Sequence, residues 1–239
     1  MQLLDPMQLF YISSIQGNAC VLSEEESWHC TRVLRLVEGD EISLTDGCGN
    51  LYRGRLTKVH HKGCLVEIIE TTKEYGKRNF QLHIAIAPTK NIDRLEWFIE
   101  KATEIGIDII TLMLCEHAER EVVKIARLEK IIIAAMKQSL KAYLPSLQEP
   151  KKFKELIKEK IPAQKFIAYC ETGSEVSLHK LYQPGANAII LIGPEGDFSP
   201  AEVEFAKQSG YTPVNLGNSR LRTETAGIVA CHTINLLNI

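Results

Sequence analysis

The feature that most constrains the fold is an alternation, from about residue 80 onward, of short apolar runs with segments of helical periodicity. The runs predict strands at Gln81 to Ala87, Ile107 to Leu114, Lys165 to Cys170, Ala188 to Ile192 and Thr212 to Leu216. Such an alternation is typical of a parallel sheet whose crossover helices cover its faces. The sequence therefore predicts an α/β domain in this part of the chain.

Capping residues mark the helix ends in the same region. A helix is predicted from Asp93, its N-cap, to Gly106. Ser199, Pro200 and Glu202 occupy the N-cap, first and third positions of another helix, which stops near residue 210. Two more helices are predicted at about 122–143 and 223–237.

The first 70 or so residues have a different rhythm, with β-type runs separated by turn signals. Strands are predicted at Leu9 to Ser13, Glu41 to Thr45, Leu51 to Leu56 and Cys64 to Glu70. Ser23 with Glu26 is a capping-box pattern for a helix from Glu24 to about Arg35, and Gly47-Cys48-Gly49 predicts a hairpin turn. A polar stretch at 71–79 indicates a boundary between a small β-barrel domain, 1–72, and the α/β domain, 73–239.

Composition favours a cytoplasmic protein without a metal centre. No run approaches the roughly 18 apolar residues of a membrane span, and the N-terminus lacks the basic and apolar regions of a leader. The seven cysteines are scattered singly, which suits a reducing compartment better than a disulfide framework. Because there is no Cys-x-x-Cys or His-x-x-x-His pair, we expect no metal site, and we expect no membrane insertion.

Positive charge is concentrated in one segment although the net charge of the chain is −2. Residues 120–165 contain 12 Lys and Arg against 5 Glu. In the predicted helix 122–143, an arc of roughly 80° at 100° per residue holds Arg127, Lys130, Lys137 and Lys141. A basic stripe of this kind could follow a phosphate backbone, and an ordinary solvated surface would have the same pattern.

Two glycine-bearing segments follow predicted strands, at the carboxyl ends where open parallel sheets bind ligands. The first is Ile192-Gly193-Pro194-Glu195-Gly196-Asp197-Phe198-Ser199, whose glycines allow close backbone approach to a flat ligand. It lacks the spacing and the lysine of a phosphate-binding loop. A cofactor cradle and a plain strand-to-helix turn are its two interpretations.

The second segment runs from Leu216-Gly217 through Arg220-Leu221-Arg222-Thr223-Glu224-Thr225-Ala226 and opens the last predicted helix. Thr223 is the predicted N-cap and Glu224 a favourable first-turn acid, so capping and dipole stabilisation would explain both. Two such loops at neighbouring strand ends, the second with two arginines, together favour a concave site for a nucleoside-like ligand.

The two segments resemble the cofactor loops of the SPOUT methyltransferases, specifically the family that methylates N3 of a uridine in bacterial small-subunit (16S) ribosomal RNA. The resemblance extends to Pro88-Thr89-Lys90, Leu95-Glu96-Trp97, Glu100 to Gly106, Lys137-Gln138-Ser139, His29 to Arg35 and Gly39-Asp40. It covers nearly the whole chain, and the N-terminal part is similar to that family's PUA-like RNA-binding barrel. The family usually has glycine at the position of Asp197; aspartate tolerates a left-handed backbone, so we expect the loop to keep its shape.

This resemblance implies a C-terminal trefoil knot, small-subunit ribosomal RNA as the partner, and a homodimer whose interface completes each site. It also implies S-adenosyl-L-methionine as the cofactor, bound in the knot. The cofactor-binding residues that it implies are Leu191, Ile192, Gly193, Glu195, Gly196, Leu216, Gly217, Leu221, Thr225 and Ala226.

The chemistry of methylation at N3 indicates roles for three side chains of the second segment. Uracil N3 becomes a good nucleophile as its proton leaves, and negative charge then spreads to the flanking carbonyl oxygens. An arginine can stabilise this charge but cannot accept the proton. We therefore expect Arg222, or failing it Arg220, to stabilise the charge, and Glu224 to act in positioning or in proton removal.

Because N3 lies on the pairing edge of the base, the target must be unpaired or flipped out, and the enzyme needs a grip on the surrounding RNA. The candidate contacts are Arg32, Arg35, Lys130, Lys137 and Lys141. Two alternatives stay open: a methyltransferase of the same fold that acts on another rRNA or tRNA nucleotide, and an RNA-binding assembly factor that has lost catalysis. Cofactor titration identifies the second, because a pure binder has no need of S-adenosylmethionine.

Overall fold

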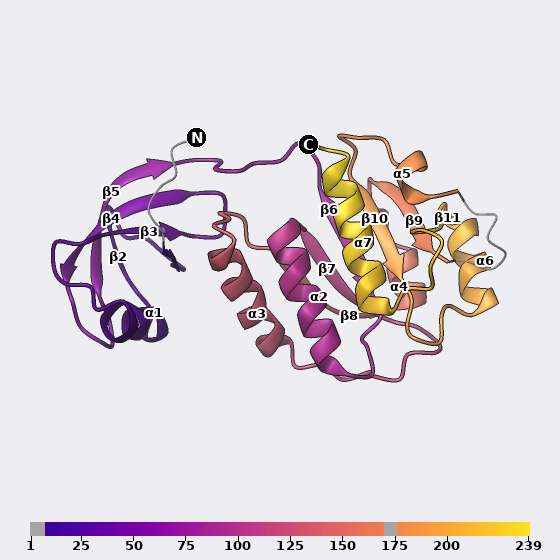
Figure 1. Cartoon of the computed structure of the whole chain (residues 1–239), viewed down its shortest axis with the longest axis horizontal. Helices are drawn as coiled ribbons and strands as arrows, with labels where there is room; N and C mark the ends of the chain where they lie inside the picture. The colour runs from indigo at the N-terminus through magenta and orange to yellow at the C-terminus, as the bar shows by residue number, and fades with distance from the viewer. Residues whose placement is uncertain (1–7, 170–175) are drawn as a thin grey trace. The chain divides into compact units, whose positions relative to one another are not determined.

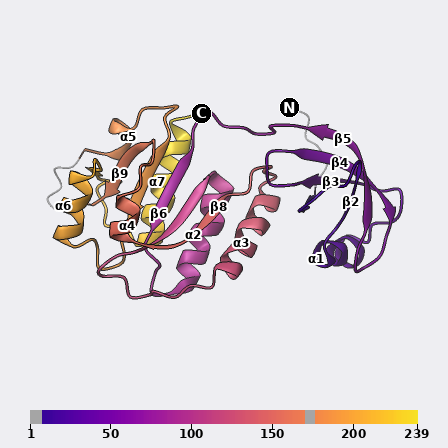
Figure 2. The ribbon, with the colours of Figure 1, turned by 180° about the vertical axis from the view of Figure 1, so that it is seen from behind.

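The computed structural model describes residues 8–169 and 176–239, which form two compact units (Figure 1; Figure 2 gives the reverse view). The first unit runs to Lys77 and also takes in Ile133–Leu144. The second comprises Arg78–Ile132 and Pro145–Ile239. Within the described part of the chain, no helix is both long enough and apolar enough to span a bilayer.

The first unit therefore includes a segment that the sequence-based ranges assign to the second domain. Backbone hydrogen bonds hold this segment against the β3–β4 turn: Gly49 N donates to Ala142 O, and Leu144 N donates to Gly47 O, both at 2.8 Å. Thr45 Oγ1 also donates to Ala142 O, at 3.3 Å. Contacts of this kind join residues far apart in sequence, so hydrophobic patterning does not predict them.

Five strands form the sheet of the first unit, in the order β1-β3-β4-β5-β2. They are β1 (Leu9–Tyr11), β2 (Ala19–Val21), β3 (Glu41–Thr45), β4 (Leu51–Lys58) and β5 (Leu65–Thr72). β1 and β3 are parallel, and the other neighbouring pairs are antiparallel. The four predicted strands are confirmed to within two residues at each end, and the predicted hairpin turn joins β3 to β4. β2 was not predicted because three residues are too few to show an alternating pattern.

The N-terminal helix of this unit has two parts, α1 (Glu24–Trp28) and a π-helical turn, η1 (His29–Val33). Ser23 Oγ accepts a hydrogen bond from Glu26 N at 3.2 Å, as the capping-box pattern predicts. The Glu26 carboxylate instead accepts from Tyr11 N at 3.3 Å and from Lys137 Nζ at 2.5 Å. The buried apolar core beside this helix includes Phe10, Leu22, Cys30, Leu44, Leu56 and Val66.

Six parallel strands form the sheet of the second unit, in the order β11-β9-β10-β6-β7-β8. They are β6 (Leu82–Ile86), β7 (Ile109–Leu114), β8 (Ser146–Lys152), β9 (Gln164–Ala168), β10 (Ala188–Ile192) and β11 (Thr212–Val214). The five predicted strands are confirmed, except that Cys170, the predicted end of one, lies outside the described residues. The edge strand β8 was not predicted, because Pro150 and neighbouring charged residues interrupt its apolar pattern.

Helices cover both faces of this sheet, as the alternating pattern predicts (Figure 1). On one face, α2 (Ile92–Ile105) packs beside α7 (Thr223–Leu236), and α7 contacts β6 and β10. On the other face lie α4 (Phe153–Ile157) and α6 (Pro200–Gln208). The two remaining helices are α3 (Ile125–Gln138) and α5 (Leu178–Leu181).

Of the three N-caps predicted in the second unit, one is confirmed and two are corrected. The Ser199 capping box of α6 is complete, because Ser199 N donates to Glu202 Oε2 at 2.9 Å and Glu202 N to Ser199 Oγ at 3.3 Å. The N-cap of α2 is Asn91 rather than Asp93, and its Oδ1 accepts from Asp93 N at 3.1 Å. In α7 the N-cap is Arg222, one residue before the predicted Thr223.

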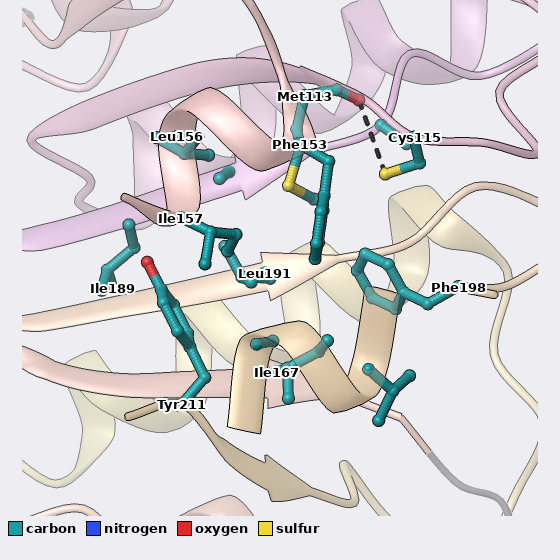
Figure 3. Packing of buried hydrophobic residues seen from close by; sticks show 14 residues of the cluster. Met113, Cys115, Phe153, Leu156, Ile157, Ile167, Ile189, Leu191, Phe198 and Tyr211 are labelled. Carbon is teal, nitrogen blue, oxygen red and sulfur yellow. Dashed lines mark hydrogen bonds between the residues drawn. The ribbon is translucent and has the colours of Figure 1, made fainter. Parts of the chain in front are cut away.

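Apolar side chains of the sheet, α4 and α6 form a core that anchors the loop after β10 (Figure 3). Phe198, 3% exposed, packs on Phe153 with ring centroids 5.7 Å apart. Burial of a phenylalanine side chain contributes about 1.5–3 kcal/mol. The end of the glycine-bearing loop is thereby fixed to the core of the unit.

Candidate functional site

A cavity of about 980 Å³ lies in the second unit where β9, β10 and β11 reach their carboxyl ends. This volume is at the upper end of the range typical of small-molecule sites. Its wall comprises Arg94, Ala168, Tyr169, Ile192 to Glu195, Asp197, Val214 to Thr223 and Ala226. The structure therefore brings together the two glycine-bearing segments that the sequence singles out.

Most of the residues expected to bind a cofactor line this cavity, and three of them do not. Leu191 is fully buried in the core shared with α4 and α6. Gly196 is exposed beside His117, where an added Cβ would lie 3.1 Å from the His117 Cβ. Thr225 is half-buried in the first turn of α7.

Asp197 gives the first loop its shape. Its backbone is left-handed, with φ 62°, as expected for this position. Asp197 Oδ1 accepts a hydrogen bond from Phe198 N at 2.8 Å, and Asp197 N donates to Pro194 O at 3.0 Å. Burial raises the pKa of the Asp197 carboxyl, against smaller lowering effects of the Phe198 N–H, Arg220 and His117.

The same loop is tied to the β6–α2 connection. Glu195 Oε1 accepts from Lys90 N at 3.0 Å. Arg120 donates from Nε to Thr89 O at 3.1 Å and from a terminal nitrogen to Lys90 O at 2.7 Å. Glu195 lines the cavity, and its Oε2 is buried and has no hydrogen-bond partner among the described residues. Sequence patterns do not indicate Arg120, because its contacts depend on tertiary structure alone.

Thr223 links the two loops directly. Its Oγ1 donates to Gly193 O at 3.0 Å. The predicted role of Thr223 as N-cap is therefore wrong: its hydroxyl bonds the neighbouring loop, and it occupies the first position of α7. Gly217, with φ 131°, supplies a backbone conformation that other residues rarely adopt. Arg220 and Arg222 are exposed and line the cavity.

Glu224 lies behind the wall rather than in it. Its side chain is 8% exposed, and Oε1 lies 3.9 Å from Nε of Arg94, which lines the cavity. Oε2 is buried and has no hydrogen-bond partner among the described residues. Arg94 was not among the predicted site residues, although an arginine in the first turn of a helix, where the dipole disfavours it, is a usable signal.

The candidate RNA contacts differ in their surroundings. Arg32 and Arg35 are exposed in the first unit, and Arg35 has a left-handed backbone with φ 59°. Lys130 is exposed on α3, whereas Lys137 is half-buried and bonded to Glu26.

The predicted basic stripe is shorter than expected. α3 ends at Gln138, because Leu140 adopts a left-handed backbone with φ 55°, so Lys141 lies beyond the helix. Within the helix, Arg127 pairs with Glu96, with Nε and Oε1 2.6 Å apart.

Among residues 8–169 and 176–239, no three His, Cys, Asp or Glu side chains are grouped so that they could hold a metal ion.

Comparison with known proteins gives relatives over almost the whole chain. A Bacillus subtilis protein named ribosomal RNA small subunit methyltransferase E is 30% identical over 231 residues, which cover 90% of this chain and 88% of that protein. A protein of the same name from Synechocystis is 28% identical over 222 residues, covering 90% of this chain and 72% of that protein.

Solved structures agree with these relatives. The crystal structure of a probable rRNA-methyltransferase from Porphyromonas gingivalis is 42% identical with a TM-score of 0.91, and the match covers 97% of this chain and 98% of that one. A ribosomal RNA small subunit methyltransferase E from Neisseria gonorrhoeae, bound to S-adenosyl methionine, is 25% identical with a TM-score of 0.84 and the same coverage.

Two family models match separate parts of the chain. The model described as an RNA methyltransferase PUA domain matches residues 22–69. The model described as an RNA methyltransferase domain matches residues 76–235, which include every residue of the cavity wall. This chain belongs to the RNA methyltransferase domain family.

Proposed function

We propose that this chain transfers the methyl group of S-adenosyl-L-methionine to N3 of a specific uridine in small-subunit (16S) ribosomal RNA. The observation that carries the proposal is the cavity at the ends of β9, β10 and β11, walled by two glycine-bearing loops and three arginines. Arginines suit an acceptor that becomes anionic as it reacts, as uracil does at N3. The small-subunit methyltransferases among the relatives support the substrate.

The cavity fits a nucleoside-like cofactor, and S-adenosyl methionine in the related Neisseria structure supports this choice. When bound, S-adenosylmethionine supplies an activated methyl group. The backbone of Gly193, Leu216 and Gly217 offers hydrogen-bonding groups, and Ile192 and Leu221 offer apolar surface. The unpartnered Oε2 of Glu195 is a further acceptor. The other proposed contacts are Leu191, Gly196, Thr225 and Ala226, of which only Ala226 lines the cavity.

We assign charge stabilisation at the reacting base to Arg222, with Arg220 as the alternative. Both line the cavity, and both sit on the loop that precedes α7. Glu224 is assigned to positioning, because its carboxylate is buried behind the wall. The proton of N3 leaves to solvent in this scheme, and no side chain is assigned as its acceptor.

Arg222→Ala tests this assignment. We expect methylation to fall by about 10²–10³-fold, the usual loss for one charge-stabilising donor, while the Kd for S-adenosylmethionine stays unchanged. Single-turnover methylation and calorimetric titration measure the two quantities. Full activity in Arg222→Ala would contradict the role, and Arg220→Ala would then be the variant to compare.

We also propose that the chain forms a homodimer. The trefoil knot stays a prediction of the resemblance to the SPOUT methyltransferases. α7 is apolar on most sides, yet Leu236 is 55% exposed and Ile228 and Val229 are only half-buried. A helix that is apolar all round is normally covered, so a second copy of the chain would bury this surface. Sedimentation of the purified protein at micromolar concentration tests the dimer.

Deletion of the gene, followed by mapping of modified uridines in both ribosomal RNAs, decides the substrate. Loss of one N3-methyluridine from the small-subunit RNA, restored by this protein, is the expected result. If all N3-methyluridines remain and another modification is lost, that other nucleotide is the target. Failure of the purified protein to bind S-adenosylmethionine would identify a non-catalytic RNA binder.

A further inference from the structure

We propose that Arg94 is a second charge-stabilising residue at the target base and that the buried carboxylate of Glu224 holds its guanidinium in place. The role deepens the function proposed above and rests on methylation at uridine N3. Neither the family resemblance nor the sequence patterns point to Arg94, which comes from α2, whereas every other residue of the cavity wall comes from residues 168–226.

The geometry joins the starts of two neighbouring helices. Arg94 lies in the first turn of α2 and Glu224 in the first turn of α7, and these helices pack together. Nε of Arg94 lies 3.9 Å from Oε1 of Glu224, with the side chains 36% and 8% exposed. The arginine thus reaches the cavity while the carboxylate stays behind it.

Local helix energetics do not explain the arginine. The positive end of a helix dipole disfavours a cation in the first turn and favours an anion there, by about 0.3–1 kcal/mol each. Glu224 is therefore well placed for α7, and Arg94 is poorly placed for α2. A carboxylate that is more than nine-tenths buried needs a compensating cation, and Arg94 supplies it.

The chemistry calls for two donors. When N3 gives up its proton to solvent, it keeps the electron pair, and the charge is shared by the carbonyl oxygens on either side. N3 then uses that pair to form the N–C bond as the S–C bond breaks and its electrons return to sulfur. Arg222 can serve one oxygen, and Arg94, from another helix, serves the other. A guanidinium already held by Glu224 needs little reorganisation when the charge develops.

Two variants test the role without leaving a buried charge unpaired. Arg94→Lys keeps the charge beside Glu224 but removes the planar, forked donor. The double variant Arg94→Gln with Glu224→Gln removes both charges at once. Lys101→Ala is the matched control, because Lys101 is an ion-paired cation of the same helix, bonded to Glu100 and Glu104 outside the cavity.

Each protein is assayed as the full chain on small ribosomal subunits that lack the modification, with cofactor affinity measured by calorimetry. We expect kcat to fall at least tenfold in Arg94→Lys and about 10²–10³-fold in the double variant. The Kd for S-adenosylmethionine and the KM for subunits stay within twofold of wild type. Arg94 also favours the ionised base through its positive charge. The rising limb of the pH–rate profile therefore moves to higher pH in the double variant, which lacks this charge, and not in Lys101→Ala.

Three outcomes would overturn the role. Wild-type kcat in the double variant would show that no group at this position acts on the base. A rise in the Kd for S-adenosylmethionine that matches the loss of rate would assign Arg94 to the cofactor carboxylate. A rise in KM at constant kcat would assign it to an RNA phosphate. Mass spectrometry of the nucleosides made by the wild type tests N3 methylation separately, so a wrong target atom is distinguished from a wrong role for Arg94.

Discussion

Asp197 holds a left-handed backbone in the loop that forms one wall of the cavity, and its own side chain compensates for the conformation. The Oδ1 atom accepts from Phe198 N at 2.8 Å, a bond that glycine at this position would lack. A non-glycine residue in this conformation costs about 1–2 kcal/mol, and aspartate is among the residues that tolerate it best. The loop therefore holds a left-handed conformation with a residue other than glycine.

Substitution of Asp197 separates backbone strain from side-chain bonding. Asp197→Ala keeps the strained backbone and loses the hydrogen bond, so we expect a loss of about 1–2 kcal/mol of folding free energy and weaker cofactor binding. Asp197→Gly loses the bond but also the strain, so its effect is smaller. Urea unfolding and calorimetry with S-adenosylmethionine measure both, and equal losses in the two variants would contradict this account.

At this scale the sequence predicts groups that lie within one segment and misses groups that meet across the fold. Gly193, Glu195 and Arg222 were identified because each belongs to a loop after a strand, and the cavity contains all three. Arg94 and Arg120 were missed because their partners, Glu224 and the backbone of the β6–α2 connection, are distant in sequence. Periodicity carries no information about such pairs.

Gly227 allows α7 to pack closely against α2; these two helices carry Glu224 and Arg94. A Cβ at this position would lie 2.5 Å from Cε2 and 2.7 Å from Cδ2 of Phe98, and 3.2 Å from Cδ1 of Ile86. Phe98 is fully buried, so its ring has no space to move. The smallest side chain is therefore required in the middle of a helix, where glycine is otherwise unfavourable.

Gly227→Ala is expected to destabilise the protein by about 1–3 kcal/mol, since overpacking outweighs the gain of about 1 kcal/mol in helix propensity. It should also lower kcat, because the two helix starts move apart. His232→Ala, at an exposed position of the same helix, is the control and should change stability by less than about 0.5 kcal/mol. An unfolding midpoint in urea that is higher for Gly227→Ala than for wild type would refute the packing argument.

His83 on β6 is a buried titratable group away from the cavity. Its Nε2 lies 2.8 Å from Thr111 Oγ1, which donates to Gln148 Oε1 at 2.9 Å. Burial, with a smaller effect of Lys151, lowers the pKa of His83 to about 4, from about 6.5 in an unfolded chain. The folded protein therefore holds a neutral ring over the range in which the unfolded chain takes up a proton.

Because the folded pKa is the lower one, the stabilisation is complete above about pH 6.5 and is lost as the pH falls towards 4. Between pH 7 and pH 5 the free energy of unfolding should fall by about 2 kcal/mol more in wild type than in His83→Gln, which has no titrating ring. Urea unfolding at the two pH values measures the difference. Parallel losses in the two proteins would show that other groups cause the acid sensitivity.

At the scale of whole elements, patterning predicted the order of strands and helices but not every end. α3 was expected to reach Tyr143, yet Leu140 turns left-handed and ends it early, a choice that the surrounding apolar pattern does not reveal. β8 was missed because it is an edge strand, which needs fewer apolar residues than a central one. These differences arise from tertiary packing, which overrides local preference.

At the scale of the whole molecule, the lysine side chains of α3 differ in whether they are available to bind RNA phosphates. Lys130 is exposed, whereas Lys137 is neutralised by Glu26. We expect Lys130→Gln to weaken binding to ribosomal RNA and to reduce the slope of log K against log salt by about 0.7–1, the value for one phosphate contact. Lys137→Gln should leave that slope unchanged. Filter binding over a series of salt concentrations tests both, and equal slopes for all three proteins would remove Lys130 from the interface.

The strand order of the second unit also has a consequence for how the chain reaches its native state. Its central pair joins Leu82 of β6 to Ala188 of β10, and β9 lies between β10 and β11. β6 pairs with β7, the next strand in sequence, only after the long crossover through α2, and β10 does not pair with β11, the strand that follows it. The chain therefore loses loop-closure entropy before these contacts form. Folding of this unit is therefore expected to be slow, in the range of milliseconds to seconds or longer, and the cavity at the strand ends forms only when these distant strands have paired.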